Sequence, residues 1–278
     1  MLSHSYPLMR FVRLVVLMLV VASASAAEPS KIRASSMVLV SEPRLPDATA
    51  FRAALEQRLA GRLKIDDMEA DGQKVILLRV RGGTVMVGLI DAPVPKGSID
   101  GLCRTAWYWR DACEATASHR GHIFVSVLGT DLDRLDARLL QTDVVASLMD
   151  ANAIASYWEA SLQSREAFLK QSALAGRDNP PVLLWVNFRV SRDPEQGLSI
   201  STEGMEAFDL REIEAKDVKR DGSEVFGLLA GMAAYLIQKG PVIKDGETIG
   251  DSPSRNIRVR QGPSYWRPDT KVYRVLFP

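Results

Sequence analysis

The sequence contains few of the residues on which most catalytic and metal sites depend. Its 278 residues include two cysteines and three histidines. It has neither a glycine-rich phosphate loop nor a Gly-x-Ser-x-Gly elbow, so nothing in it supports nucleotide binding or the common esterase chemistry. Serine, histidine and aspartate side chains can still meet in space without a motif, and such a site would have to use one of these few histidines. We therefore identify no catalytic residue from the sequence.

Neither acidic nor basic residues are in excess, and no basic run occurs. The chain has 35 Lys and Arg residues against 34 Asp and Glu residues, and the two signs are interspersed along its length. Nucleic-acid binding depends on clustered cations that neutralise phosphates, so we expect no nucleic-acid partner. After the N-terminal segment, no apolar stretch approaches the roughly 20 residues that a membrane-spanning helix requires.

The N-terminal segment has the three parts of a secretory signal peptide. Arg10 and Arg13 form a basic region, residues 14–22 are all apolar, and small residues follow at positions 23–27. Nine apolar residues are too few to span a bilayer, so we expect a cleavable signal peptide at residues 1–26 rather than an anchor. The mature protein, with 33 basic and 34 acidic residues, is then expected to be periplasmic or secreted, without a stable membrane anchor.

Apolar periodicity predicts an α+β fold with mixed sheets and amphipathic helices. Helices are predicted at residues 48–63, 111–119, 132–150, 164–174 and 223–239. Strands are predicted at residues 37–40, 75–81, 84–91, 122–128, 153–158, 182–190, 198–201, 256–261 and 272–277. Gly82 and Gly83 between two of these strands predict a two-residue hairpin turn.

The strongest cluster of turn-forming residues lies at residues 176–181, which include two prolines, one glycine and one asparagine. It is the best candidate for a boundary between two parts of the chain. We therefore expect either one compact unit or two packed lobes, comprising residues 30–177 and 178–278.

Both cysteines follow the predicted signal peptide. An exported protein folds in an oxidising compartment, where two cysteines tend to pair. One continuous helix over residues 104–118 would hold Cys103 and Cys113 about 15 Å apart and forbid a bond. However, Asp111 followed by Glu114 has the spacing of a helix start, which would leave Cys103 in a loop that can fold back. We expect a Cys103–Cys113 disulfide, and the alternative is two buried, inert thiols.

His119 and His122 are the only histidines after the predicted signal peptide. With Cys103 and Cys113 they would make four potential ligands for a tetrahedral metal site, but a disulfide would occupy both sulfurs. His119 is expected at the end of a helix and His122 at the start of a strand, so their side chains need not converge. We predict no metal and no cofactor.

Aromatic residues are most concentrated at Trp107, Tyr108 and Trp109. Because large aromatic side chains mostly serve packing, we favour a buried position beside the cysteine pair. If they are exposed, they would instead form a binding surface, since tryptophan and tyrosine are typical anchors of protein interfaces. Tyr265 and Trp266 near the C-terminus leave the same two interpretations open.

Several short segments resemble a bacterial family known as domain of unknown function 4261. In the second half of the chain they include TEGMEAFDLREIE at residues 202–214, LIQKG at 236–240, KDGETIG at 244–250 and IRVRQGPS at 257–264. In the first half they include SEP at residues 41–43, APVP at 92–95, AWYW at 106–109 and HRGHIFVS at 119–126. The resemblance covers roughly residues 37–265. The family has no assigned activity, so the resemblance agrees with the fold and leaves the function open.

The signal peptide, the neutral mature charge and the missing catalytic motifs together favour a non-enzymatic protein of the cell envelope. We expect it to bind a partner, and we expect that partner to be another protein. The candidate binding residues are Trp107, Tyr108, Trp109, His119 and His122. Two alternatives are a hydrolytic or metal-dependent enzyme centred on the two histidines, and a structural subunit of an envelope complex.

Overall fold

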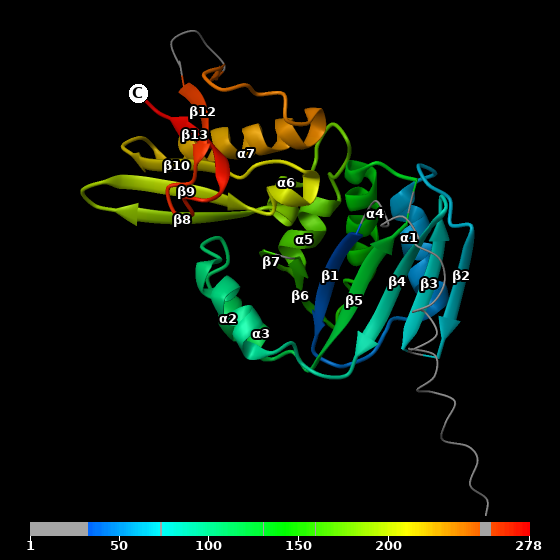
Figure 1. The fold of residues 1–278 in the computed structure, drawn as a ribbon. Coiled ribbons are helices and arrows are strands. Elements are labelled where there is room, and N and C mark those ends of the chain that lie inside the picture. Colours follow the sequence, from blue (N-terminus) through cyan, green and yellow to red (C-terminus); the bar gives the residue numbers. More distant parts are fainter. Residues whose placement is uncertain (1–32, 73, 130, 159, 251–256) are drawn as a thin grey trace, which may run out of the picture. The chain divides into compact units, whose positions relative to one another are not determined.

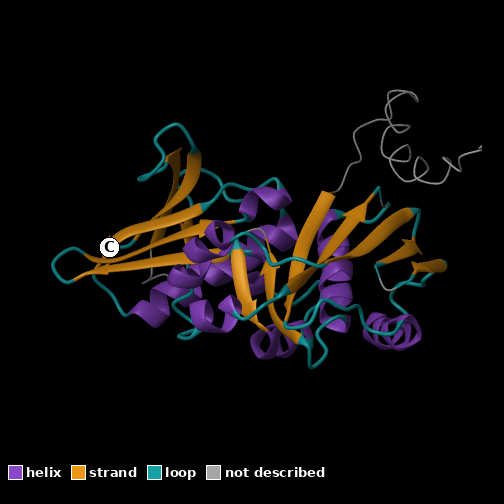
Figure 2. Ribbon diagram, turned by 90° about the horizontal axis from the view of Figure 1, so that it is seen from below, coloured by secondary structure: helices purple, strands orange, loops and turns teal. Residues whose placement is uncertain are grey.

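Strands in two sheets and helices packed on them make up the protein (Figures 1 and 2). The computed structural model describes residues 33–72, 74–129, 131–158, 160–250 and 257–278. The predicted signal peptide lies outside these described residues. The α+β fold class predicted from the sequence is confirmed.

The first sheet contains seven antiparallel strands in the described part of the chain, in the order β2-β3-β4-β5-β1-β6-β7. They are β1 (Arg33–Val40), β2 (Asp67–Asp71), β3 (Val75–Val80), β4 (Gly83–Ile90), β5 (Gly121–Leu128), β6 (Ala153–Trp158) and β7 (Ser161–Ser164). β1 lies near the middle of this sheet, between β5 and β6. Its side chains alternate between two buried environments, because Val38 and Val40 join the main core and Leu39 joins a second, smaller one.

The turn between β3 and β4 lies one residue earlier than predicted. Gly83 pairs with Val80, so the turn residues are Arg81 and Gly82 rather than the two glycines. Both turn residues have positive φ angles, 44° and 71°, as a type I′ hairpin turn requires. Glycine therefore has a conformational role at the second turn position.

One face of the first sheet is covered by helices α1 (Ala48–Leu59) and α4 (Arg134–Ser147), while α5 (Arg165–Ser172) packs near β6 and β7. Helix α1 buries Phe51, Leu55 and Leu59, as its apolar spacing predicts. It ends before the predicted residue 63, because Ala60 adopts a left-handed conformation with φ 47°. Helix α4 is buried on most sides and hydrogen-bonds the sheet through Gln141 and Ser36 on β1, 3.0 Å apart.

A buried carboxylate holds the end of α1 to α4. Asp143 on α4 accepts a 2.7 Å hydrogen bond from Nη2 of Arg62, which follows α1. Burial raises the pKa of Asp143, and the nearby positive charges of Arg62 and Arg58 act in the opposite direction. The ionised form is therefore stabilised mainly by these arginines.

Replacing Arg62 by alanine is expected to lower the free energy of unfolding at pH 7 by about 1–2 kcal/mol, because it leaves the buried Asp143 charge with less compensation. The pKa of Asp143 in the folded variant should rise further above its unfolded value near 3.8. As the pH falls, Asp143 then takes up a proton in the native state before it does so in the unfolded state. The stability deficit of the variant should therefore shrink as the pH falls through the pKa of Asp143 in the folded protein. Urea unfolding of both proteins at several pH values measures this, and a deficit that does not depend on pH would contradict it.

The second sheet is mixed. Its order in the described residues is β11-β12-β13-β10-β9-β8, with β10 and β13 parallel and the other neighbours antiparallel. The strands are β8 (Asn187–Asp193), β9 (Gly197–Glu203), β10 (Ile213–Val218), β11 (Thr248–Ile249), β12 (Ile257–Pro263) and β13 (Lys271–Leu276). Helix α7 (Gly222–Lys239) covers one face, and the short η3 (Met205–Phe208) lies between β9 and β10.

The predicted strand over residues 182–190 is wrong in its first half. Val182–Trp185 form a single helical turn, α6, and β8 begins only at Asn187. The turn is closed by the Val186 amide, which donates to the Val182 carbonyl at 2.8 Å. Residues 182–186 are all apolar and almost entirely buried. A continuous apolar segment has no periodicity that would distinguish a helical turn from a strand.

Helix α6 connects the two sheets physically. Trp185 donates a 2.9 Å hydrogen bond from Nε1 to the hydroxyl of Thr142 on α4. Gln163 on β7 donates to the Leu183 carbonyl at 2.8 Å. Buried residues of both sheets belong to one continuous hydrophobic core.

Candidate functional site

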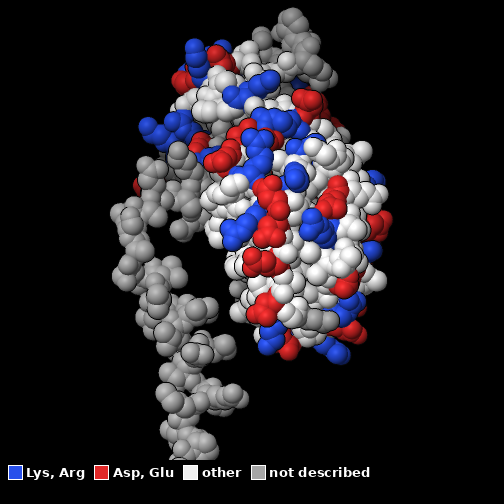
Figure 3. Space-filling model, turned by 90° about the vertical axis from the view of Figure 1, so that its right-hand side faces the viewer, with Lys and Arg blue, Asp and Glu red and all other residues white. Residues whose placement is uncertain are grey.

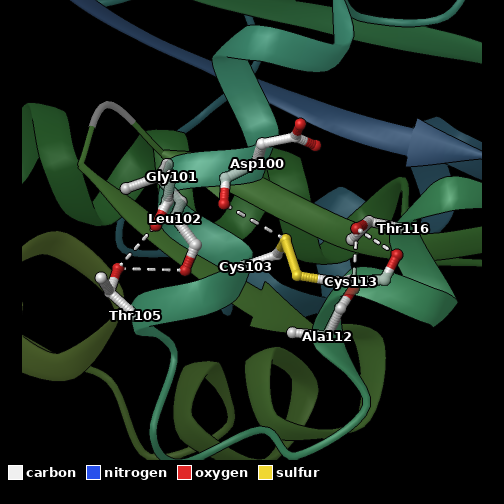
Figure 4. The surroundings of a disulfide bond; sticks show 8 residues. All are labelled: Asp100, Gly101, Leu102, Cys103, Thr105, Ala112, Cys113 and Thr116. Carbon is white, nitrogen blue, oxygen red and sulfur yellow. Dashed lines mark hydrogen bonds between the residues drawn. A yellow bond between two sulfur atoms is a disulfide. The ribbon is translucent and has the colours of Figure 1, made fainter.

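Two regions gather side chains with binding chemistry, and the first is built around the cysteines. Helices α2 (Lys96–Thr105) and α3 (Ala112–Ala117) are separated by a bend that begins at Ala106. This break brings Cys103 and Cys113 to a Cα separation of 4.9 Å, and they form a disulfide (Figure 4). Cys103 lies within α2 and not in a loop as predicted, but the separate start of α3 still allows the bond.

Helices α2 and α3 cover the second core. Leu39 on β1, Ala155 on β6 and Leu162 on β7 meet Ile99 and Cys103 of α2 there. Since adjacent β1 residues face the main core, this is the sheet face opposite α4. The disulfide therefore joins α2 to α3 within a helical cover that packs on this face of the first sheet.

The loop closed by the disulfide carries the aromatic residues. Trp107 is 51% exposed and Tyr108 is 39% exposed, so burial, the favoured interpretation, is wrong for these two residues. Trp109 is partly buried and packs against the second core. Trp107 donates from Nε1 to the Phe188 carbonyl at 3.0 Å and contacts the edge of the Phe226 ring. The indole N–H of Trp107 is thus hydrogen-bonded, while much of its ring is exposed to solvent.

Tyr108 is fixed in the same way. Its hydroxyl donates to the Leu162 carbonyl at 2.8 Å. Burial raises the pKa of this hydroxyl, which keeps it a neutral donor. The loop therefore bridges β7 of the first sheet and β8 of the second, with both aromatic side chains held at their tips.

The two histidines hold the proline-rich loop before α2. His119 accepts the Val94 amide at Nε2, 2.9 Å away, and its Nδ1 lies 2.5 Å from the Thr116 carbonyl. An accepting Nε2 leaves Nδ1 to donate to the Thr116 carbonyl. His122 is bonded through Nδ1 to the Ala92 carbonyl at 2.8 Å. Both histidines therefore hold the backbone of the loop at residues 92–95 in place. Separately, the described residues contain no group of three or more His, Cys, Asp or Glu that could hold a metal.

The second region is a hollow of about 400 Å³ on the second sheet. Ile200 and Ile213 point into the core under α7, so the alternating residues Ser199, Ser201 and Glu214 face the other side. The hollow is lined by Arg189, Val190, Ser191, Ser199, Ser201, Thr202, Glu203, Glu214, Trp266 and Arg267.

A buried carboxylate organises the loop on this hollow. Glu214 is 2% exposed and accepts hydrogen bonds from the Ser264 hydroxyl at 2.5 Å and the Tyr265 amide at 2.8 Å. The Ser264 hydroxyl oxygen in turn accepts the amides of Trp266 at 3.0 Å and Arg267 at 2.9 Å. These hydrogen bonds therefore fix the backbone of the loop that carries the exposed indole of Trp266 to the buried Glu214.

Sequence reasoning singled out Tyr265 and Trp266 but missed Glu214 and Ser264. The available indication was the alternation of Ser199, Ser201 and Glu203, whose polar side chains share one face of a strand. Nothing local links Glu214 to Ser264, because 50 residues separate them.

The surface adds no strongly charged region on the side shown in Figure 3, where acidic and basic side chains are interspersed. Among the described residues, none of the helices is both long and apolar enough to cross a membrane.

Residues 201–276 match the family model described as Domain of unknown function (DUF4261). The match begins in β9 and ends in β13, and it includes Glu214, Trp266 and Arg267 of the hollow. The family resemblance inferred from short motifs is thus confirmed in this part of the chain. No curated protein matches the sequence.

Proposed function

We propose that this chain, which carries a domain of the DUF4261 family at residues 201–276, is an exported, non-enzymatic binding protein of the cell envelope. Its partner is another protein, which docks on Trp107 and Tyr108. The observation that carries the proposal is the exposure of these two side chains on a loop closed by a disulfide.

The loop has the composition of an interface hot spot. Tryptophan, tyrosine and arginine are the residues that contribute most at protein interfaces. Trp107 and Tyr108 are flanked by the exposed Arg104 and Arg110. The fitting partner therefore presents an apolar pocket with acidic residues at its rim.

The loop is also held in place before any partner binds. The Trp107 indole and the Tyr108 hydroxyl are each bonded to a backbone carbonyl, and the disulfide closes the chain around them. Little side-chain freedom remains to be lost on association, which favours affinity.

Location in the envelope is supported by the N-terminal sequence and the cysteine pair. Residues 1–26 have the composition of a signal peptide, and disulfides persist in oxidising compartments outside the cytosol. Fractionation of cells that produce the full chain, followed by mass measurement, tests this. A mature chain beginning near residue 27 in the envelope or medium supports the proposal, and an uncut cytosolic chain contradicts it.

Replacing Trp107 by alanine is expected to weaken partner binding by at least tenfold, about 1.4 kcal/mol or more, because it removes the central anchor. The partner is first identified by placing a photo-crosslinking phenylalanine analogue at position 107 in intact cells. The matched control carries the same analogue at Leu174, which is 69% exposed on a different segment. We expect one protein to be captured at position 107 and not at 174. The same products from both positions, or unchanged binding by Trp107→Ala, would contradict the docking surface.

A further inference from the structure

The hollow on the second sheet has a lining that differs from that of an apolar ligand pocket. Its volume of about 400 Å³ lies within the range of roughly 300–1,000 Å³ usual for small-molecule sites. Most such sites are predominantly apolar, whereas serine, threonine, arginine and glutamate dominate here. A matching ligand must therefore exchange many hydrogen bonds.

We infer that this hollow is a binding site for a neutral saccharide, with Trp266 as the platform for one sugar ring. The inference goes beyond protein binding and uses none of the residues assigned to it. A pyranose ring carries hydroxyls around its rim and C–H groups on its faces. The rim pairs with hydroxyl and charged side chains, which offer both donors and acceptors, and a face packs on an indole ring.

The charge balance favours a neutral ligand over an anion. Two arginines, Arg189 and Arg267, and two glutamates, Glu203 and Glu214, line the hollow, so their charges are equal in number and opposite in sign. Arg189 is bonded to Glu203, with Nε 2.7 Å from Oε2. An anion bound at Arg189 would have to displace this carboxylate from the guanidinium. Sugar hydroxyls can instead donate to the glutamate and accept from the arginine while the pair stays intact.

The platform is rigid and open at the same time. Trp266 is 47% exposed, which leaves much of its surface accessible. Its backbone is held through the Ser264 hydroxyl to the buried Glu214, and its ring meets the edge of Tyr265 with centroids 5.9 Å apart. A preformed aromatic surface beside paired charges and strand hydroxyls such as Ser201 needs no rearrangement to receive a sugar.

The test uses the full mature chain and defined probes. Maltotriose, cellotriose and chitotriose serve as neutral saccharides, while trigalacturonic acid and inorganic phosphate serve as anions. Binding is detected by saturation-transfer NMR and quantified by calorimetric titration. We expect at least one neutral trisaccharide to bind, and Trp266→Ala to weaken it about tenfold, the size of one lost aromatic contact.

Two variants give the result its specificity. Trp266→Phe keeps an aromatic ring and should restore part of the affinity. Tyr235→Ala removes an equally exposed aromatic ring on α7, away from the hollow, and should leave saccharide binding unchanged. The inference is overturned if no neutral trisaccharide binds, if only the anions bind, or if Trp266→Ala binds as tightly as the unaltered protein.

Discussion

Replacement of Trp185 by alanine is expected to lower the free energy of unfolding by about 3–5 kcal/mol, the usual cost of removing a buried indole. Trp185 is 1% exposed in α6, where the chain passes from the first sheet to the second. Its ring packs on Phe208, with centroids 5.5 Å apart, and its Nε1 donates to Thr142 on α4. The substitution therefore leaves a cavity and removes a buried hydrogen bond at one place. Denaturant unfolding followed by circular dichroism measures the loss.

Trp185→Phe is the matched control. It keeps an aromatic ring in the core and removes mainly the bond to Thr142, so the expected loss is about 1–2 kcal/mol. A loss equal to that of alanine would mean that the hydrogen bond, and not the ring volume, carries the effect.

The same variant tests whether the chain unfolds as one unit or as two lobes. The sequence predicts lobes at residues 30–177 and 178–278 as one of two possibilities, and Trp185 falls in the second. Because Trp185 shares one core with α4 and β1, we expect a single transition that shifts as a whole. Two transitions of which only one moves would show that the lobes unfold independently.

The fold was predictable where apolar residues repeat with a clear period. Phe51, Leu55 and Leu59 recur at helical spacing, and they form the buried side of α1. Prediction failed where the predicted strand is apolar throughout, at residues 182–186, because both faces are buried and no period remains. It also failed at element ends such as Ala60, where the backbone of a single residue changes direction.

The binding regions depend on contacts between distant residues, which a single sequence does not reveal. The cysteine pair was predictable, because ten positions separate the two residues and the oxidising compartment expected from the N-terminal sequence favours a bond. The position of the Trp107 indole was not, since it depends on a hydrogen bond to Phe188, 81 residues away. The same holds for Glu214 beneath the Trp266 loop.

Replacing both Cys103 and Cys113 by serine is expected to destabilise the protein by about 3 kcal/mol. The bond closes a loop with a sequence separation of 10, and a cross-link of that length removes about this much chain entropy from the unfolded state. Cys103 is also buried, so a serine there places a hydroxyl in the second core. Unfolding of the variant is compared with that of the wild type with and without reductant. Equal stability of oxidised and reduced wild type would contradict the prediction.

Removal of the disulfide should also weaken binding at the docking surface formed by Trp107 and Tyr108, but not at the hollow on the second sheet. The disulfide restrains the loop that carries Trp107, whose indole reaches Phe188 at the start of β8. Without it, more conformations of the loop compete with the one that bonds Phe188, and partner binding should weaken by roughly the same factor as that population falls. The Trp266 loop is held by Glu214 and Ser264 and contains no cysteine, so saccharide binding by the folded variant should be unchanged. If both activities fall together, the variant has lost its fold, and if neither falls, the disulfide stabilises the chain without positioning Trp107.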